Sequence, residues 1–503
     1  MSTNFSALDW VIVVFYLTGT VAIGLYVNRY IRTMSDFVVA GRALKTRLAI
    51  ATMVGSELGL VTVMYSAQKG FTGGFAAFHI GLIAGVMTLL VGITGFIVVP
   101  LRRHRVMTIP EFYEIRYTRG VRVLGGFLLA FAGILNMGLF LKAGAVFVTE
   151  LTGLSDPNAV NIVMTALIVL VLAYTILGGM VSVAITDYVQ FVVLSVGLLL
   201  TCGLAVNQLG WSSIVETVEK IHGDGGFDPF DNDGFGWDYV LMMVFAGVAS
   251  CALWQTAAVR ACASESEQVV RRLYIWSSIG FMIRCMVPQF LGICALTYFW
   301  NGGDVVARFF TATGELVDPA TSLAAMPAFL SQILPVGLIG IVGSGMLAAF
   351  MSTHDTYLLC WATALTEDVV NPLSGGRLGM RARLLLTRIF IVAIAFFLLL
   401  WGLWYPLGQD LWDYMFVTGS IYVSGAFAVV VAGLYWRGAR PLGAYLALLA
   451  GAGAVFGLKP VKDAFGIEVS SAVITLGVNL NAIVLMIVGS MAQRAWESQK
   501  GAA

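Results

Sequence analysis

Six ionisable side chains interrupt long apolar stretches of this chain: Glu57, Lys142, Asp187, Arg284, His354 and Asp355. A charge at the centre of a bilayer costs about 2.5–3.5 kcal/mol on insertion scales. Charged groups that stay at that depth usually line a cavity, an ion path or the interior of a helix bundle. These six residues are therefore the first candidates for binding an ion or a solute.

The composition indicates a protein that lies almost entirely within a membrane. Of 503 residues, 59% are hydrophobic and 11% are charged, and the mean hydropathy is +0.88. A spanning helix needs roughly 20 apolar residues, and thirteen segments come near that length: 8–27, 47–69, 74–101, 123–150, 157–177, 180–207, 237–260, 270–300, 335–364, 382–405, 410–436, 440–458 and 470–492. We predict an all-α polytopic membrane protein with about 13 transmembrane helices. The net charge of +1 gives no reason to expect a nucleic-acid partner.

The distribution of lysine and arginine predicts the orientation. With the thirteen spans above, loops on one side hold 22 of the 29 basic residues. Cytoplasmic loops carry the excess of basic residues, so we expect the N-terminus outside, the C-terminus in the cytoplasm and a plasma-membrane location, such as the bacterial inner membrane. The outer loop at 208–236 is acidic, but its DPFDNDG run departs from the EF-hand spacing and is better interpreted as a solvated loop.

Two spans contain interruptions that transporters use for binding. The second holds Gly55, Glu57 and Gly59 near mid-depth, and the seventh has a small-residue centre, 246–250, followed by Trp254 and Gln255. Secondary transporters place solute and ions at helices that unwind at matching positions of two inverted halves. Five spans separate the two interruptions, which favours a five-plus-five inverted repeat over simple close packing of glycine-rich helices.

Five short segments resemble the signature segments of the solute:sodium symporter family, which includes the bacterial proline permease and the sodium–glucose transporters. They occur in family order over about 400 residues: 36–42 (DFVVAGR), 108–116 (TIPEFYEIR), 178–190 (GGMVSVAITDYVQ), 348–353 (AAFMST) and 433–437 (GLYWR). The resemblance implies a LeuT-like core with one helix before it and two after. The expected units are 1–45 with the extra first helix, 46–207 and 237–436 as the two repeats, the loop 208–236, and 437–503 with the last two helices.

The resemblance also implies a sodium site between the broken second span and the ninth. Its backbone ligands would be Gly55, Leu58 and Ala349, and its hydroxyl ligands Ser352 and Thr353. The two hydroxyls could instead bond a carbonyl four residues earlier in their helix. Asp187 matches the family's Thr-Asp pair and would attract or relay sodium, with a polar anchor at a helix end as the alternative.

The expected substrate-binding residues are Glu57, Thr62, Lys142, Trp254, Gln255 and Arg284. The guanidinium of Arg284 suits a carboxylate because it can donate two parallel hydrogen bonds. Glu57 could assist sodium, hold a cationic group or bind a proton, and the two residues could hold the ends of a zwitterion or pair with each other. Trp254 could stack on the solute or pack between helices. Lys142 could bind an anion or extend to the outer surface.

We therefore expect a sodium-coupled symporter that takes up a small organic solute, favouring an amino acid or another carboxylate-bearing metabolite. Its partners would be the solute, the sodium ion and the lipid bilayer, with Na⁺ as coupling ion and no cofactor. A proton-coupled transporter that uses Glu57 and a transporter-like solute sensor are the alternatives. We do not expect an enzyme, because the sequence has no HExxH or GxSxG motif. The identity of the solute, the sodium stoichiometry and the oligomeric state do not follow from the sequence.

Overall fold

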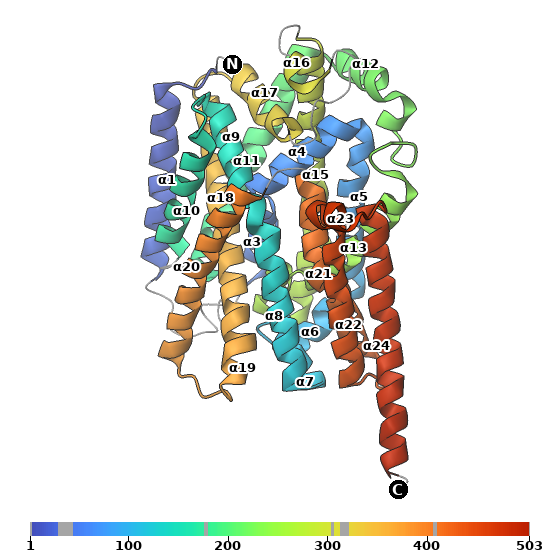
Figure 1. The fold of residues 1–503 in the computed structure, drawn as a ribbon. Helices are drawn as coiled ribbons and strands as arrows, with labels where there is room; N and C mark the ends of the chain where they lie inside the picture. Colours follow the sequence, from blue (N-terminus) through green and yellow to red (C-terminus); the bar gives the residue numbers. More distant parts are fainter. Residues whose placement is uncertain are drawn as a thin grey trace.

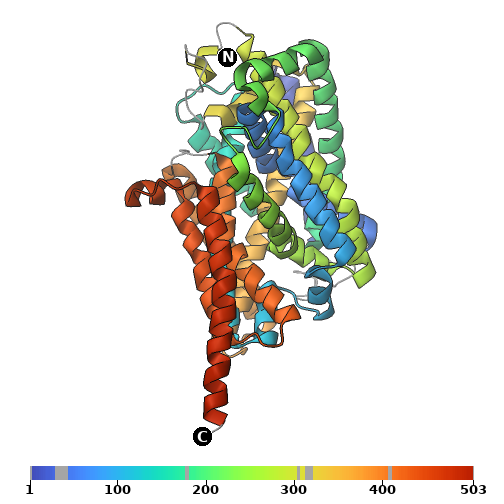
Figure 2. The ribbon, with the colours of Figure 1, turned by 90° about the vertical axis from the view of Figure 1, so that its right-hand side faces the viewer.

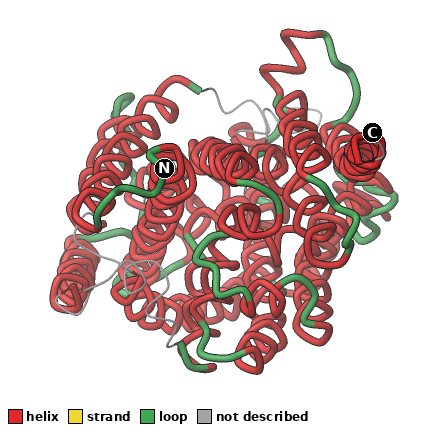
Figure 3. Tube along the Cα trace, turned by 90° about the horizontal axis from the view of Figure 1, so that it is seen from below, coloured by secondary structure: helices red, strands yellow, loops and turns green. Residues whose placement is uncertain are grey.

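The structure is a computed structural model, and it describes residues 3–28, 44–175, 180–302, 306–311, 321–405 and 410–501. These residues form helices and connecting loops, with one isolated β-bridge between Leu44 and Ser264. Seen from below, most helices run close to the line of sight (Figure 3). The segment 36–42, the first two residues of the segment 178–190, and most of the first basic loop lie outside the described residues.

The helices of the first half of the chain match the predicted spans closely. They are α1 (Ala7–Asn28), α3 (Thr46–Glu57), α4 (Leu60–Gly73), α5 (Phe78–Thr94), α6 (Val98–Arg103), α7 (Ile109–Arg116), α8 (Arg119–Asn136), α9 (Phe140–Thr152), α10 (Ala159–Thr175) and α11 (Met180–Leu209). Their ends follow local rules. The hydroxyls of Thr108 and Thr118 cap α7 and α8, and Gly95 and Gly153 end α5 and α9 in the left-handed conformation.

The second half continues with helices of the same kind. They are α12 (Trp211–His222), α13 (Gly236–Leu253), α14 (Gln255–Ala263), α15 (Glu267–Trp300), α16 (Val306–Phe309), α17 (Ala325–Ile333), α18 (Leu338–Thr363), α19 (Asn371–Leu373), α20 (Met380–Trp404), α21 (Leu411–Tyr435), α22 (Pro441–Ala452), α23 (Lys459–Phe465) and α24 (Ser471–Gly501). A helix lies at each of the thirteen predicted spans. Within the described residues, eight helices are long and apolar enough to cross a membrane, or up to nine if one bent pair is counted as a span. The number thirteen therefore stays a prediction.

The predicted loop at 208–236 contains a helix that the sequence analysis did not predict. This helix, α12, is amphipathic: Ile214 and Val218 are buried, while Glu216, Glu219 and Lys220 are exposed. It lies at the same end of the molecule as the N-terminus, and the C-terminus lies at the opposite end (Figure 1). An odd number of spans requires the two termini to lie on opposite sides of the membrane.

The helices α22 and α24 form a pair at one edge of the bundle and pack against α21. In Figure 2 this pair stands beside the rest of the molecule, with α24 projecting furthest. The interior helices form the core, where α15 packs along α4 and α5, and α18 packs against α3, α4, α9 and α11. The segments that hold the candidate site residues therefore lie at the centre, surrounded by other helices.

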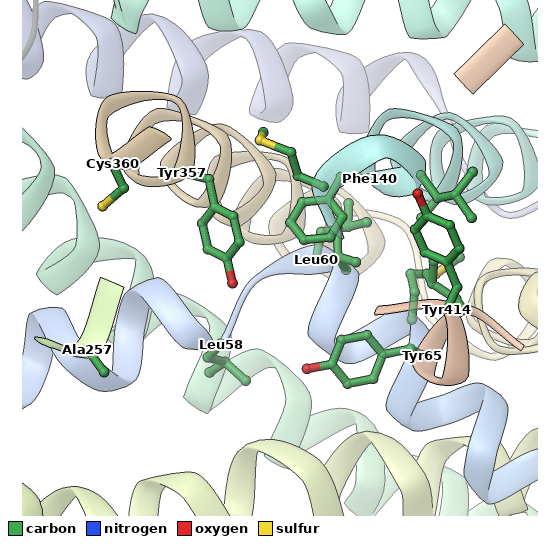
Figure 4. Packing of buried hydrophobic residues seen from close by; sticks show 14 of the residues in the cluster. Leu58, Leu60, Tyr65, Phe140, Ala257, Tyr357, Cys360 and Tyr414 are labelled. Carbon is green, nitrogen blue, oxygen red and sulfur yellow. The ribbon is translucent and has the colours of Figure 1, made fainter. Parts of the chain in front are cut away.

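Both predicted interruptions are present as breaks between helices. The helix α3 ends at Glu57 and α4 begins at Leu60, with Leu58 and Gly59 between them. In the second half of the chain, Trp254 has an extended backbone (φ −65°, ψ 125°) and separates α13 from α14. Figure 4 shows Leu58 on the link between the two helical segments, with Tyr357, Leu60 and Tyr65 around it. The predicted all-α architecture with two broken helices is confirmed for the described residues.

Candidate functional site

Glu57 and Arg284 form an ion pair beside the first break. Arg284 Nη1 lies 2.8 Å from Glu57 Oε2 and also donates to the Glu57 carbonyl oxygen at 2.9 Å. The Arg284 guanidinium stacks on the Phe281 ring, with 4.2 Å from Cζ to the ring centroid. The side chains of Arg284 and Glu57 are 11% and 13% exposed, so both remain open to a cavity. The last helical residue before the break thus carries a charge that is paired and still accessible.

The two broken helices meet at Glu57. The hydroxyl of Thr256, in the first turn of α14, donates to Glu57 Oε1 at 2.7 Å. The N-terminus of a helix carries a partial positive charge, which favours a carboxylate nearby. One helical turn further along α14, Arg260 Nε donates to the Thr52 carbonyl oxygen of α3 at 3.1 Å. These contacts join α3, which precedes the first break, to α14, which follows the second break.

A central cavity of about 130 Å³ lies next to this pair. Its wall includes Glu57, Tyr65, Trp254, Tyr357 and Trp412. The indole N–H of Trp254 donates to the Tyr357 hydroxyl at 3.0 Å, which fixes both rings against the cavity. A further cavity of about 150 Å³ shares Glu57, Trp254 and Trp412 with it and also contacts Arg284. Glu57 therefore lines two adjoining cavities, and Arg284 lines the second of them.

The residues expected to bind sodium lie where the first break meets α18. Gly55, Leu58, Ala349, Ser352 and Thr353 are all buried there. The Gly55 carbonyl oxygen accepts a hydrogen bond from Gln190 Nε2 of α11 at 3.4 Å. The Thr353 hydroxyl, by contrast, has no hydrogen-bond partner among the described residues.

A Cβ atom added at Gly59 would lie closer than 3.0 Å to the Thr353 hydroxyl oxygen, so only glycine lets α18 approach the break this closely. Asp187 lies in α11, and its side chain is outside the described part of the chain.

Three residues expected to bind solute do not line either cavity. The hydroxyl of Thr62 donates to the Glu57 carbonyl oxygen at 2.7 Å and so bridges the break. Lys142 Nζ donates to the carbonyl oxygen of Tyr405 at 2.9 Å. Gln255 is buried, and its Oε1 faces the Ile109 backbone N–H of α7 at 3.5 Å. Of the six expected residues, the structure brings Glu57, Trp254 and Arg284 together at the cavities.

Several residues of the cavity walls were not identified from the sequence. Tyr357, Trp412 and Phe416 face the cavities, although nothing distinguishes them in the sequence from aromatic residues that pack in a core. The side chain of Lys69 in α4 is also buried: it is 4% exposed and pairs with Asp410 Oδ2 at 2.8 Å and with Asp413 at 3.1 Å. That pairing joins α4 to the start of α21, across more than 340 residues of sequence.

The sequence and the fold of this chain are similar to those of known proteins. The family model "Sodium:solute symporter family" matches residues 37–451. The chain belongs to the sodium:solute symporter family. The family consists of sodium-coupled secondary transporters rather than enzymes, so the predictions of transport and of sodium as coupling ion are confirmed at that level.

Individual relatives of this symporter are distant. The sodium/sialic acid symporter NanT of Aliivibrio fischeri is 24% identical over 74% of the chain and 71% of the relative. The sodium/glucose cotransporter of Vibrio parahaemolyticus is 24% identical over 88% and 84%. A substrate-bound, outward-open structure of a Na⁺-coupled sialic acid symporter superposes with a TM-score of 0.79 at 17% identity, over 97% of the chain and 98% of that structure. The amino-acid-bound structure of MhsT has a TM-score of 0.54 at 14% identity, over 89% and 98%. These two structures have the same fold as this chain, and the predicted LeuT-like fold is thereby confirmed.

Proposed function

We propose that this symporter takes up a small zwitterionic solute, with an amino acid as the favoured class, together with sodium. The observation that carries the proposal is the Glu57–Arg284 pair at 2.8 Å, in which Glu57 lines both cavities and Arg284 lines the larger one. The pair is electrically neutral, so a zwitterion that separates it leaves the net charge of the site unchanged. A buried charge that loses its partner without a replacement is costly.

The free donor of Arg284 supports a carboxylate as one end of the solute. Arg284 uses Nη1 for both bonds to Glu57, while Nε is buried without a hydrogen-bond partner among the described residues. A guanidinium binds a carboxylate best through two parallel bonds. A solute carboxylate would accept from Arg284, and an amine would take the place of the guanidinium at Glu57.

We place sodium beside the solute, at Gly55, Leu58, Ala349, Ser352 and Thr353, with Asp187 close to its path. Hard oxygen donors suit a hard cation, and the unpartnered Thr353 hydroxyl at the break is such a donor. Sodium would fix the geometry of the break between α3 and α4, and Glu57 directly precedes this break. Sodium and solute therefore stabilise the same arrangement, and each raises the affinity for the other by the same factor.

Transport would then follow alternating access, with α3, α4, α13 and α14 moving against the helices around α18. Each sodium ion that enters down 100 mV supplies about 2.3 kcal/mol, apart from its concentration gradient. We expect this to occur in a plasma membrane with the N-terminus outside and the C-terminus in the cytoplasm.

A thermal-shift screen of the purified full chain tests the proposal. A ligand present at 100 times its Kd stabilises the native state by about 2.7 kcal/mol. We expect amino acids to raise the melting temperature in sodium and to have little effect in potassium, and we expect sugars to have no effect. Stabilisation by a sugar, or by no amino acid, would contradict the zwitterion. Stabilisation that follows pH and ignores sodium would favour the alternative, a proton-coupled transporter that uses Glu57.

A further inference from the structure

The larger of the two cavities that Glu57 lines, here called the side cavity, lies between helices from both halves of the chain. It occupies about 150 Å³ between α5, α13, α15 and α21. Three of these helices, α5, α13 and α15, lie close together in Figure 1. Its walls are formed mainly by apolar residues, among them Ile80, Ile83, Ala84, Met243, Ala246 and Phe281. The side cavity is thus an apolar space that ends at the charged pair.

Apart from Glu57, Arg284 and the indole N–H groups of its two tryptophans, the polar side-chain groups of the side cavity are Ser250, Thr88 and Cys251, and the last two are engaged within their own helices. The Thr88 hydroxyl donates to the Ala84 carbonyl oxygen at 2.7 Å, and the Cys251 thiol donates to the Val248 carbonyl oxygen at 3.4 Å. A hydroxyl buried without a hydrogen bond costs about 1–3 kcal/mol. A polyhydroxylated solute would lose this free energy once for each unpaired hydroxyl, whereas a hydrocarbon group would lose none. The lining therefore selects against sugar hydroxyls.

The size of the side cavity limits what it can hold. An apolar cavity of about 150 Å³ stays dry and accommodates a benzene-sized molecule. A branched aliphatic or phenyl group matches this volume. A methyl group would leave most of it unfilled, and two fused rings would exceed it.

We propose that the side cavity is the subsite for the solute's side chain, and that the transported solute is an amino acid with a branched aliphatic or aromatic side chain. This inference rests on the proposed function, because Glu57 and Arg284 must first hold the amine and the carboxylate. The Phe281 ring that stacks on Arg284 also forms part of the side-cavity wall. A solute carboxylate bound to Arg284 thus places the attached carbon chain beside an apolar surface.

Two substitutions change the volume of the side cavity in opposite directions. Ala246→Leu adds an isobutyl group in place of a methyl group at the wall, and Met243→Ala removes most of a buried side chain. Neither residue is part of the charged pair or of the proposed sodium site. The matched control is Ala166→Leu, the same chemical change at an exposed position of α10.

Sodium-dependent binding of L-alanine, L-leucine, L-phenylalanine and L-tryptophan to the purified full chain is the measurement. Burial of three methylene equivalents predicts that the parent binds L-leucine about 50-fold tighter than L-alanine. In Ala246→Leu this ratio should fall to about threefold or less, with L-alanine affinity retained. Met243→Ala should weaken L-leucine and strengthen L-tryptophan, and Ala166→Leu should match the parent.

The possible failures are distinguishable. If L-alanine and L-leucine bind equally in the parent, or if their ratio is the same in parent, Ala246→Leu and Met243→Ala, the side cavity is not the subsite although the zwitterion site stands. If no amino acid binds in sodium, the proposed function and this inference are both wrong.

Discussion

Replacing Gly59 by alanine tests the link between the first break and α18. The backbone at Gly59 has φ −85° and ψ 164°, which alanine adopts readily, so any effect must come from the space around the new methyl group. An ideal Cβ at this position would lie 3.3 Å from Thr353 Cβ and closer than 3.0 Å to the Thr353 hydroxyl oxygen. The two segments must therefore separate, or the hydroxyl must turn away from the break.

Both responses disturb the proposed sodium site. Overpacking of this kind costs typically 1–3 kcal/mol of stability. Loss of the Thr353 hydroxyl as a ligand is worth about 1.4 kcal/mol, which corresponds to a tenfold change in an equilibrium constant. We therefore expect Gly59→Ala to raise the sodium concentration for half-maximal uptake at least tenfold. The control is Gly477→Ala in α24, where an added Cβ would meet no atom within 4 Å.

The assay is solute uptake into proteoliposomes as a function of external sodium, with the amount of inserted protein measured in parallel. A second variant, Gly59→Ala with Thr353→Ala, separates packing from ligation. Removing the hydroxyl removes the closest contact and leaves the one to Cβ at 3.3 Å, so the double variant should regain most of the thermal stability but not the sodium affinity. If Gly59→Ala keeps the parental sodium dependence and melting temperature, α18 does not supply a ligand at this break, and the reasoning fails.

Three further predictions concern single side chains. Thr353→Ala alone should raise the half-maximal sodium concentration about tenfold, and an unchanged value with protein present in the membrane would remove this hydroxyl from the site. Arg284→Lys keeps the charge but loses the paired donors, so solute affinity measured by titration should fall at least tenfold, and normal binding would contradict the carboxylate role. Lys69→Met leaves Asp410 and Asp413 facing each other without their cation; it should lower the free energy of unfolding by about 2–3 kcal/mol, less than a fully buried pair because Asp413 reaches solvent. Asp410→Asn is its comparison in a thermal melt, and an unchanged melting temperature in Lys69→Met would show that the cluster does not stabilise the fold.

The positions of the helices were predictable because hydropathy and length determine them. The break at Leu58 and Gly59 was predictable as well, since two glycines and a carboxylate within an apolar helix leave few alternatives. The pairing of Glu57 with Arg284 was one of several possibilities, and it depends on which faces of α3 and α15 meet. Those faces follow from the packing of α15 along α3 and α4, which sequence periodicity alone does not provide.

The remaining cavity residues could not be predicted, for two physical reasons. In a membrane protein, an apolar residue that faces lipid and one that faces a cavity have the same character, so Trp412 and Phe416 carry no distinguishing signal. Breaks also change which face a side chain occupies. Gln255 follows the break at Trp254 directly, and its side chain faces α7 instead of either cavity. Lys142 lies on a helix near the centre, but Tyr405 supplies a carbonyl acceptor away from both cavities.

The most direct test of the central claim is the reciprocal coupling between sodium and solute. The Kd of the solute should be measured over a range of sodium concentrations, and the Kd of sodium with and without saturating solute, on the same purified protein. Sodium coupling through the break at Leu58 and Gly59 predicts that each ligand tightens the other by the same factor, with no such effect from potassium or from a change in pH. Solute affinity that does not depend on sodium, or that depends on pH alone, would contradict the claim.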